Sequence, residues 1–111
     1  MSNETPANAG PYADIAPALN DYTRQVLFGQ VWERGELPKR DRSLITVATL
    51  VALYRHNELP FHLKFAQQNG VTREELIELI THVAFYAGWP CANTAIEAAR
   101  KVFEESPSRL G

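Results

Sequence analysis

The residues best suited to chemistry in this sequence are Glu58 and His62, which lie four positions apart in HNELPFHLKF, residues 56–65. Pro60 between them suits the first turn of a helix, where a backbone N–H has no intrahelical partner anyway. Residues four apart are neighbours on a helix, so both side chains are expected on one side of the helix start. An imidazole held there can donate or accept a proton near neutral pH.

The helix start acts on both groups. Its unpaired N–H groups and the positive end of its dipole favour an ionised Glu58 and disfavour an imidazolium at position 62, while the Glu58 carboxylate acts in the opposite direction. One interpretation is therefore a poised acid/base pair. The other is a surface histidine beside a helix-start carboxylate, and the spacing leaves both open.

Other side chains could contribute to a pocket or only to structure. The Arg42 guanidinium could hold a carboxylate in bidentate fashion or form a surface salt bridge. His82 falls at the edge of a predicted buried helix face, which suits a core or interface histidine as well as a pocket residue. Cys91 is the only cysteine, which excludes an intrachain disulfide and a cysteine-based metal cluster, and we expect it to be a small packing residue.

The composition is that of one soluble globular domain, with 111 residues, 45% hydrophobic and 22% charged. A net charge of -2, from scattered acidic and basic residues, gives no electrostatic footprint for nucleic acid. The basic run at residues 39–42 is interrupted by Asp41 and favours a solvated helix start over a binding role. The sequence contains no glycine-rich phosphate-binding loop, no zinc-binding His-Glu-x-x-His motif and no Gly-x-Ser-x-Gly motif of a serine nucleophile.

No segment of the sequence predicts a membrane span or a leader. The longest apolar run, residues 44–54, is far shorter than the roughly 20 residues needed to cross a bilayer. The first 17 residues have neither the basic nor the apolar region of a secretory signal. We therefore expect a cytoplasmic protein without a membrane partner.

The pattern of apolar residues predicts an all-α fold, a compact bundle of about five helices. We expect a flexible arm over residues 1–13, one helical domain over 14–106 and a tail over 107–111. Thr72 and Glu75 form a capping-box motif, which starts one helix, and Asn69-Gly70 is a left-handed stop for the helix before it. The predicted helices cover residues 17–32, 38–55, 60–68, 73–88 and 90–105.

The predicted helix over residues 38–55 is apolar on nearly every side, which is typical of a helix surrounded by protein. A domain this small is expected to cover it completely only with another subunit. Five β-branched residues leave a strand open as an alternative, but nothing else in the sequence supplies strands to pair with it.

The order of these segments resembles the carboxymuconolactone decarboxylase family. The resemblance covers about residues 27–105 and includes Arg-Ser-Leu, Glu-Leu-x-x-His-Leu, Asn-Gly-Val-Thr-Arg-Glu-Glu and Tyr-Ala-Gly-x-Pro. The matching stretches are FGQVWERGELP (28–38), LPKRDRSLITVATLVAL (37–53) and HNELPFHLKFAQQNGVTREELIELITHVAFYAGWPCANTA (56–95).

The resemblance implies an all-helical fold completed by oligomerisation, as a homotrimer or homohexamer. The family's thiol branch, the alkylhydroperoxidase-like enzymes, carries Cys-x-x-Cys and, three residues later, a histidine. If His62 matches that histidine, Arg55 and Glu58 stand at the two cysteine positions, so thiol peroxidase activity is not expected. Glu-Leu-x-x-His is instead similar to the decarboxylase branch.

The same resemblance implies a decarboxylase or related lyase acting on a small lactone or keto carboxylic acid in aromatic compound breakdown. No cofactor and no metal is expected. In the implied site His62 supplies a proton, Glu58 orients His62, and Arg42 anchors the substrate carboxylate or lactone oxygen. The pocket is shaped by Trp32, His82 and Tyr86. The alternative is an accessory oligomer that keeps the scaffold and binds a small molecule without converting it.

Overall fold

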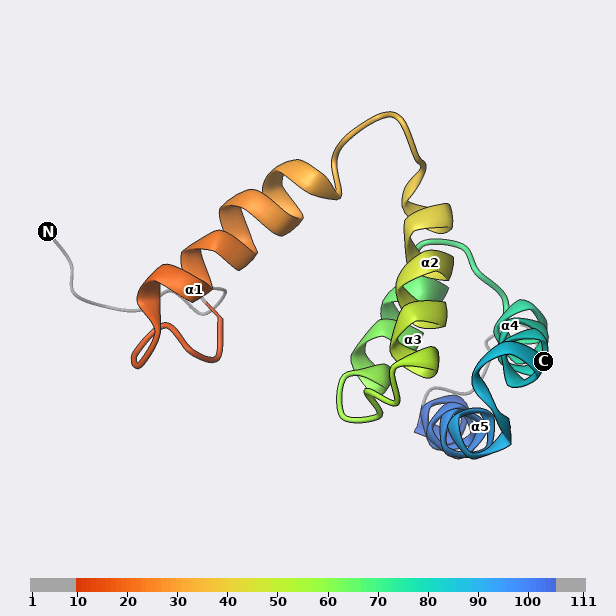
Figure 1. Ribbon diagram of the computed structural model, residues 1–111. Coiled ribbons are helices and arrows are strands. Elements are labelled where there is room, and N and C mark those ends of the chain that lie inside the picture. Colours follow the sequence, from red (N-terminus) through yellow and green to blue (C-terminus); the bar gives the residue numbers. More distant parts are fainter. Residues whose placement is uncertain (1–9, 106–111) are drawn as a thin grey trace, which may run out of the picture. The chain divides into compact units, whose positions relative to one another are not determined.

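The structure, a computed structural model, describes residues 10–105 and is built from helices joined by short turns (Figure 1). No strand occurs among these residues, so the prediction of an all-α fold is confirmed. Most of the predicted arm and the predicted tail lie outside the described residues. The helices are α1 (Pro17–Asp21), the π-helix η1 (Tyr22–Val31), α2 (Lys39–Ala52), α3 (Leu59–Gln68), α4 (Arg73–Ala87) and α5 (Trp89–Glu105).

The chain divides after Pro38 into two compact units. The single domain predicted over residues 14–106 stays a prediction. Within the stretch from residue 10 to residue 105, no helix is long and apolar enough to cross a membrane.

The N-terminal unit contains one continuous helical segment, in which α1 passes directly into η1. The Trp32 N–H donates to the Leu27 carbonyl at 2.9 Å, five residues back, which is π-type bonding. The predicted helix over residues 17–32 therefore has the right extent, but it is wrong in kind beyond Asp21. Wider turns disrupt the apolar stripe expected from α-helical spacing, and Tyr22 and Val26 are exposed.

The C-terminal unit contains two pairs of helices. Figure 1 shows α2 and α3 side by side along their length, with α4 and α5 seen nearly end-on beside them. Each helix buries one stripe of apolar side chains at three- and four-residue spacing, which is the pattern of an amphipathic helix. The core residues are Val47, Val51, Leu59, Leu63, Ala66, Val71, Leu76, Ile80, Ala84, Ala92, Ala95, Ala99 and Val102.

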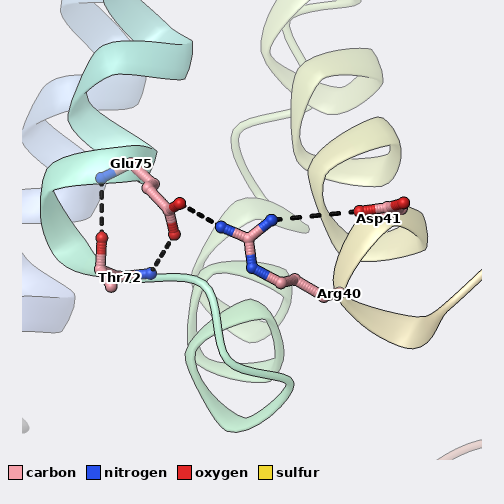
Figure 2. A network of polar contacts seen from close by, with 4 residues as sticks. All are labelled: Arg40, Asp41, Thr72 and Glu75. Atoms are coloured by element: carbon pink, nitrogen blue, oxygen red, sulfur yellow. Dashed lines mark hydrogen bonds and ion pairs between the residues drawn. The ribbon is translucent and has the colours of Figure 1, made fainter.

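The best-signalled helix boundaries are found where the sequence predicts them. Gly70 has a φ of 100° after α3, and Gly88 has a φ of 104° between α4 and α5. At the start of α4 the Thr72 hydroxyl accepts from the Glu75 N–H at 3.1 Å, and the Glu75 carboxylate accepts from the Thr72 N–H at 2.9 Å (Figure 2). The predicted capping box is confirmed.

Helix α2 ends at Ala52, three residues before the predicted end at Arg55. The reason is Tyr54, whose backbone is left-handed with a φ of 60°. The Arg55 N–H donates to the Leu50 carbonyl at 2.8 Å and the Tyr54 N–H donates to the Val51 carbonyl at 3.1 Å. These two bonds form a Schellman motif, which reverses the chain at this point.

Helix α2 is buried on one side only within a single chain. Its buried residues are Ser43, Val47 and Val51, whereas Ile45 is 54% exposed. Burial of the other sides was expected to require another subunit, and this part of the expectation stays a prediction.

Replacing Thr72 with alanine should lower the free energy of unfolding by about 1 kcal/mol, because the Glu75 N–H loses its side-chain acceptor. The variant Thr72→Ser keeps the hydroxyl and is the matched control, expected to unfold close to the wild type. Urea denaturation followed by circular dichroism measures both. An alanine variant as stable as the wild type would show that the capping box contributes nothing to the fold.

Candidate functional site at the start of α3

Glu58 and His62 lie one turn apart at the start of α3. Glu58 is the N-cap residue, and its carbonyl accepts a long hydrogen bond from the His62 N–H at 3.4 Å. The Glu58 side chain makes no capping hydrogen bond, and its carboxylate lies 3.9 Å from the Arg55 Nε. The carboxylate is therefore not used to hold the helix end and remains available to act on neighbouring groups.

His62 is half-buried, with aromatic rings on both sides of it along α3. Its ring is edge-on to Phe61, with centroids 4.9 Å apart, and to Phe65 at 6.3 Å. Burial lowers the pKa of His62 below its ordinary value of 6.5, and the charge of Glu58 acts in the opposite direction. Since burial is the larger effect, the neutral imidazole is the main form at neutral pH.

The turn between α2 and α3 is held by side chains of α5. The Thr94 hydroxyl donates to the Tyr54 hydroxyl at 3.5 Å, and the Cys91 thiol lies 3.8 Å from the Ala52 carbonyl, to which it donates. The Tyr54 ring also packs against His56, with centroids 5.2 Å apart. Cys91 is partly buried against the core, in agreement with its predicted packing role.

Two hollows lie between α2 and α4, with volumes of about 540 and 380 Å³. His82 lines both, and Tyr86 lines the smaller one. Their rings are 5.0 Å apart, so these two predicted pocket residues come together. Because His82 is exposed, it is not a core histidine. The larger hollow is lined by Arg40, Leu44, Ile45, Ala48, Glu75, Glu78, Leu79, His82 and Val83.

Arg40 is the arginine at this hollow, and sequence reasoning missed it in favour of Arg42. Figure 2 shows its guanidinium bonded to the Glu75 carboxylate and directed also toward Asp41, 4.0 Å away. The Thr72 N–H and Arg40 together hold the pKa of Glu75 below its ordinary value. The capping box was the available signal, because it fixes a carboxylate that a nearby cation can bind.

The other predicted site residues of the C-terminal unit do not line these hollows. None of Arg42, Glu58 and His62 lines either one. Arg42 is half-buried on α2, where its carbonyl accepts from the Thr46 hydroxyl at 2.8 Å. Trp32 belongs to the N-terminal unit, is buried, and stacks on Phe28 with centroids 6.0 Å apart. Its predicted place in a pocket with His82 and Tyr86 stays a prediction.

His62 should make the stability of the protein depend on pH. Since folding lowers its pKa below 6.5, the unfolded chain binds the proton more tightly, and the free energy of unfolding should fall as the pH drops from about 7.5 to about 5. Above the unfolded pKa this contribution is fully present.

Urea titrations across this range, in which Glu75 remains ionised, measure the effect. The variant His62→Gln should show a flatter dependence of the free energy of unfolding on pH than the wild type. Equal slopes in the wild type and His62→Gln would refute the burial effect on His62.

The chain is similar to known proteins over most of its length. The profile of the carboxymuconolactone decarboxylase family matches residues 17–101. The chain is 42% identical over 92 residues to a 4-carboxymuconolactone decarboxylase of Acinetobacter baylyi, which covers 83% of this chain and 69% of that protein. It is 33% identical over 78 residues to a nitrosuccinic acid decarboxylase of Metarhizium robertsii.

That second match covers 70% of this chain but only 54% of the fungal protein, so the chain spans about half of its length. An uncharacterised 15.0 kDa protein of Paracoccus denitrificans is 25% identical over 93 residues, or 82% of this chain and 69% of that protein. The regular elements within residues 17–101, the region that the family profile matches, are all helices. Because this match covers well over half of the chain, the protein belongs to the carboxymuconolactone decarboxylase family.

Proposed function

We propose that this protein is a decarboxylase that acts without a cofactor on a small lactone or keto carboxylic acid. The proposal is supported by similarity to two proteins named as decarboxylases, of 4-carboxymuconolactone and of nitrosuccinic acid. The observation that carries the mechanism is a half-buried imidazole, His62, one helical turn from the N-cap carboxylate Glu58.

Decarboxylation of such a substrate sets three requirements for a site. Breaking the carbon–carboxylate bond releases CO2 and leaves an electron pair, which flows into the conjugated carbonyl as a dienolate. A carbon of the dienolate then takes one proton. The site must provide hydrogen-bond donors or a cation for the developing oxyanion, an acid near the carbon, and a dry region around the departing carboxylate.

In the proposed mechanism, His62 delivers the proton. Its burial favours the neutral form, so the imidazolium is a stronger acid than a solvated one and returns to the neutral form readily after transfer. The Glu58 carboxylate opposes this effect, which maintains a protonated fraction near neutral pH. The rings of Phe61 and Phe65 supply apolar surface beside the imidazole.

We assign the substrate carboxylate or lactone oxygen to Arg42, because a guanidinium can bind two oxygens in one plane. Arg42 is half-buried in the first turns of α2, where it is less hydrated than a free surface arginine. His82 and Tyr86, whose rings lie 5.0 Å apart, are assigned to the pocket wall.

A second copy of the chain completes the site in this proposal. The hollow at His82 and Tyr86 does not include His62 or Arg42, and it is open to solvent within one chain. Tyr86 is 82% exposed and Phe85 is 72% exposed, which is unusual for aromatic residues of a soluble protein unless a partner covers them. A homotrimer or homohexamer that buries these rings would also exclude water from the reaction.

His62→Gln should lower kcat/KM by about 10² to 10⁴, the usual contribution of a general acid. Thermal shift against a panel of lactone and keto acids identifies a ligand, and CO2 release on that ligand measures the rate. The exposed Gln68→Ala at the far end of the same helix is the control and should retain wild-type activity.

The pH dependence gives an independent check on the same residue. If the imidazolium is the donor, kcat/KM should fall as the pH rises through the pKa of His62, which lies below 6.5. A rate in His62→Gln within a few-fold of the wild type would remove the acid role. A ligand that binds without releasing CO2 from any member of the panel would favour the accessory binding protein instead.

A site shared between copies predicts complementation. His62→Gln and Tyr86→Ala are each expected to lose activity, but coexpressed chains should form mixed oligomers with some sites that combine an intact His62 with an intact Tyr86. Purified mixed oligomers should therefore recover part of the wild-type rate, while a simple mixture of inactive homo-oligomers should not. A monomer in light scattering, or mixed oligomers with no recovered activity, would contradict the shared site.

A further inference from the structure

Helices α2, α3 and α4 are each followed by a residue with a positive φ, but the residue types differ. Gly70 follows α3 and Gly88 follows α4, whereas the corresponding residue after α2 is Tyr54, with a φ of 60°. Between residues 10 and 105, Tyr54 is the only residue other than glycine with a positive φ. An L-amino acid with a bulky side chain rarely adopts this conformation, because Cβ lies too close to the backbone.

The ends of α2 and α3 use the same backbone hydrogen bonds. After α3, the Val71 N–H donates to the Ala66 carbonyl at 2.9 Å and the Gly70 N–H donates to the Gln67 carbonyl at 3.0 Å. The equivalent bonds after α2 are 2.8 and 3.1 Å long. Glycine therefore suffices for this motif, and the cap itself does not require the tyrosine side chain.

The Tyr54 side chain instead makes contacts that a glycine cannot make. Its hydroxyl accepts from the Thr94 hydroxyl on α5, and its ring packs against His56 inside the turn. The Cys91 contact to Ala52 lies one turn earlier on α5 and holds the last turn of α2. The turn is thus attached to α5 on one side and packed against its own residues on the other.

This turn leads directly to the candidate site. Arg55 follows Tyr54, and its carbonyl accepts from the Glu58 N–H at 3.2 Å. The Arg55 guanidinium also lies beside the Glu58 carboxylate. The backbone direction at Tyr54 therefore sets the position of Arg55 and, through these two contacts, that of Glu58 at the start of α3.

We propose that Tyr54 is a positioning residue for the Glu58–His62 pair, and that its strained backbone and attached ring hold the turn that carries Glu58. Its importance for catalysis rests on the proposed function. Strain of this kind persists only where the surroundings hold it, and it occurs often at functional sites. Tyr54 does not need to touch the substrate, because it acts through Arg55 and Glu58.

Tyr54→Gly separates a positioning role from a capping role. Glycine relieves the strain and keeps the Schellman bonds, so the Tm should stay within about 5 °C of the wild type. Loss of the ring should lower kcat by about ten-fold or more with a smaller change in KM, because misplacement of a catalytic group affects the chemical step more than binding. Tyr54→Phe and Thr94→Val each remove the contact between the two hydroxyls and should give smaller losses.

The titration of His62, followed by NMR, provides a readout that does not depend on turnover. Glu58 raises the pKa of His62, so Glu58→Gln should lower it, and Tyr54→Gly should lower it part of the way. Tyr54→Asn, which tolerates the left-handed backbone but lacks the ring, should behave like Tyr54→Gly.

The outcomes distinguish this proposal from the proposed function. If the wild type decarboxylates no substrate but Tyr54→Gly still lowers the pKa of His62, the positioning role stands and the decarboxylase proposal fails. If Tyr54→Gly leaves both kcat and the pKa of His62 unchanged, Tyr54 is only a helix cap and the positioning role is overturned. Should the glycine variant not fold, an unchanged pKa of His62 in both Tyr54→Phe and Thr94→Val would overturn it instead.

Discussion

The close packing of α5 against the other three helices of the C-terminal unit is the constraint on which the candidate site depends. The buried face of α5 carries Ala92, Ala95 and Ala99, whose small side chains let neighbouring backbones approach closely. Polar contacts then fix the positions of those neighbours. Cys91 and Thr94 reach the end of α2 and the turn after it, and Lys64 of α3 pairs with Glu105 of α5 at 3.2 Å.

These contacts determine where Glu58 and His62 lie, because both residues follow the turn that α5 holds. The far end of α5 is fixed as well, since Arg73 at the start of α4 donates to the Phe103 carbonyl at 3.2 Å and lies over its ring. A rigid helix attached at both ends places the start of α3 more accurately than the short turn could by itself. Accurate placement matters for a proton donor, because a shift of about 1 Å can cost two orders of magnitude in rate.

The electrostatics of His62 follow from the same packing. The rings of Phe61 and Phe65 and the body of α3 remove part of the water around the imidazole, which disfavours its charged form. Glu58 is exposed, so solvent screens its charge, and its effect on the pKa of His62 is smaller than that of burial. A carboxylate more deeply buried at this position would hold the imidazolium more firmly and make it a weaker acid.

Sequence reasoning succeeded where the signal was local. The capping box at Thr72 and Glu75, the left-handed glycines and the three- and four-residue spacing of apolar residues each act within a few positions of the chain. The structure contains the helix boundaries that the capping box and these glycines predict. The early end of α2 could not be predicted in this way, because tyrosine is a poor residue for a left-handed turn and its contact with Thr94 spans 40 positions. The capping box marks the Glu75 carboxylate, but Arg40 was missed because the two residues lie 35 positions apart.

The sequence was also informative about His82 and Tyr86, because residues four apart on one helix must share a face. It could not indicate that this face borders a hollow separate from Arg42 and His62, since that depends on how α2 packs against α4.

The separation of this hollow from Arg42 and His62 matters for the chemistry. A carboxylate loses CO2 more readily away from water, yet His62 is only half-buried and the α2–α4 hollow is open within one chain. The exposed rings of Phe85 and Tyr86 and the exposed side of α2 supply the apolar surface that closure by a second copy would use. In the proposed enzyme, association of copies of the chain would therefore contribute to catalysis as well as to stability, because it would exclude water from sites that a single chain leaves exposed to solvent.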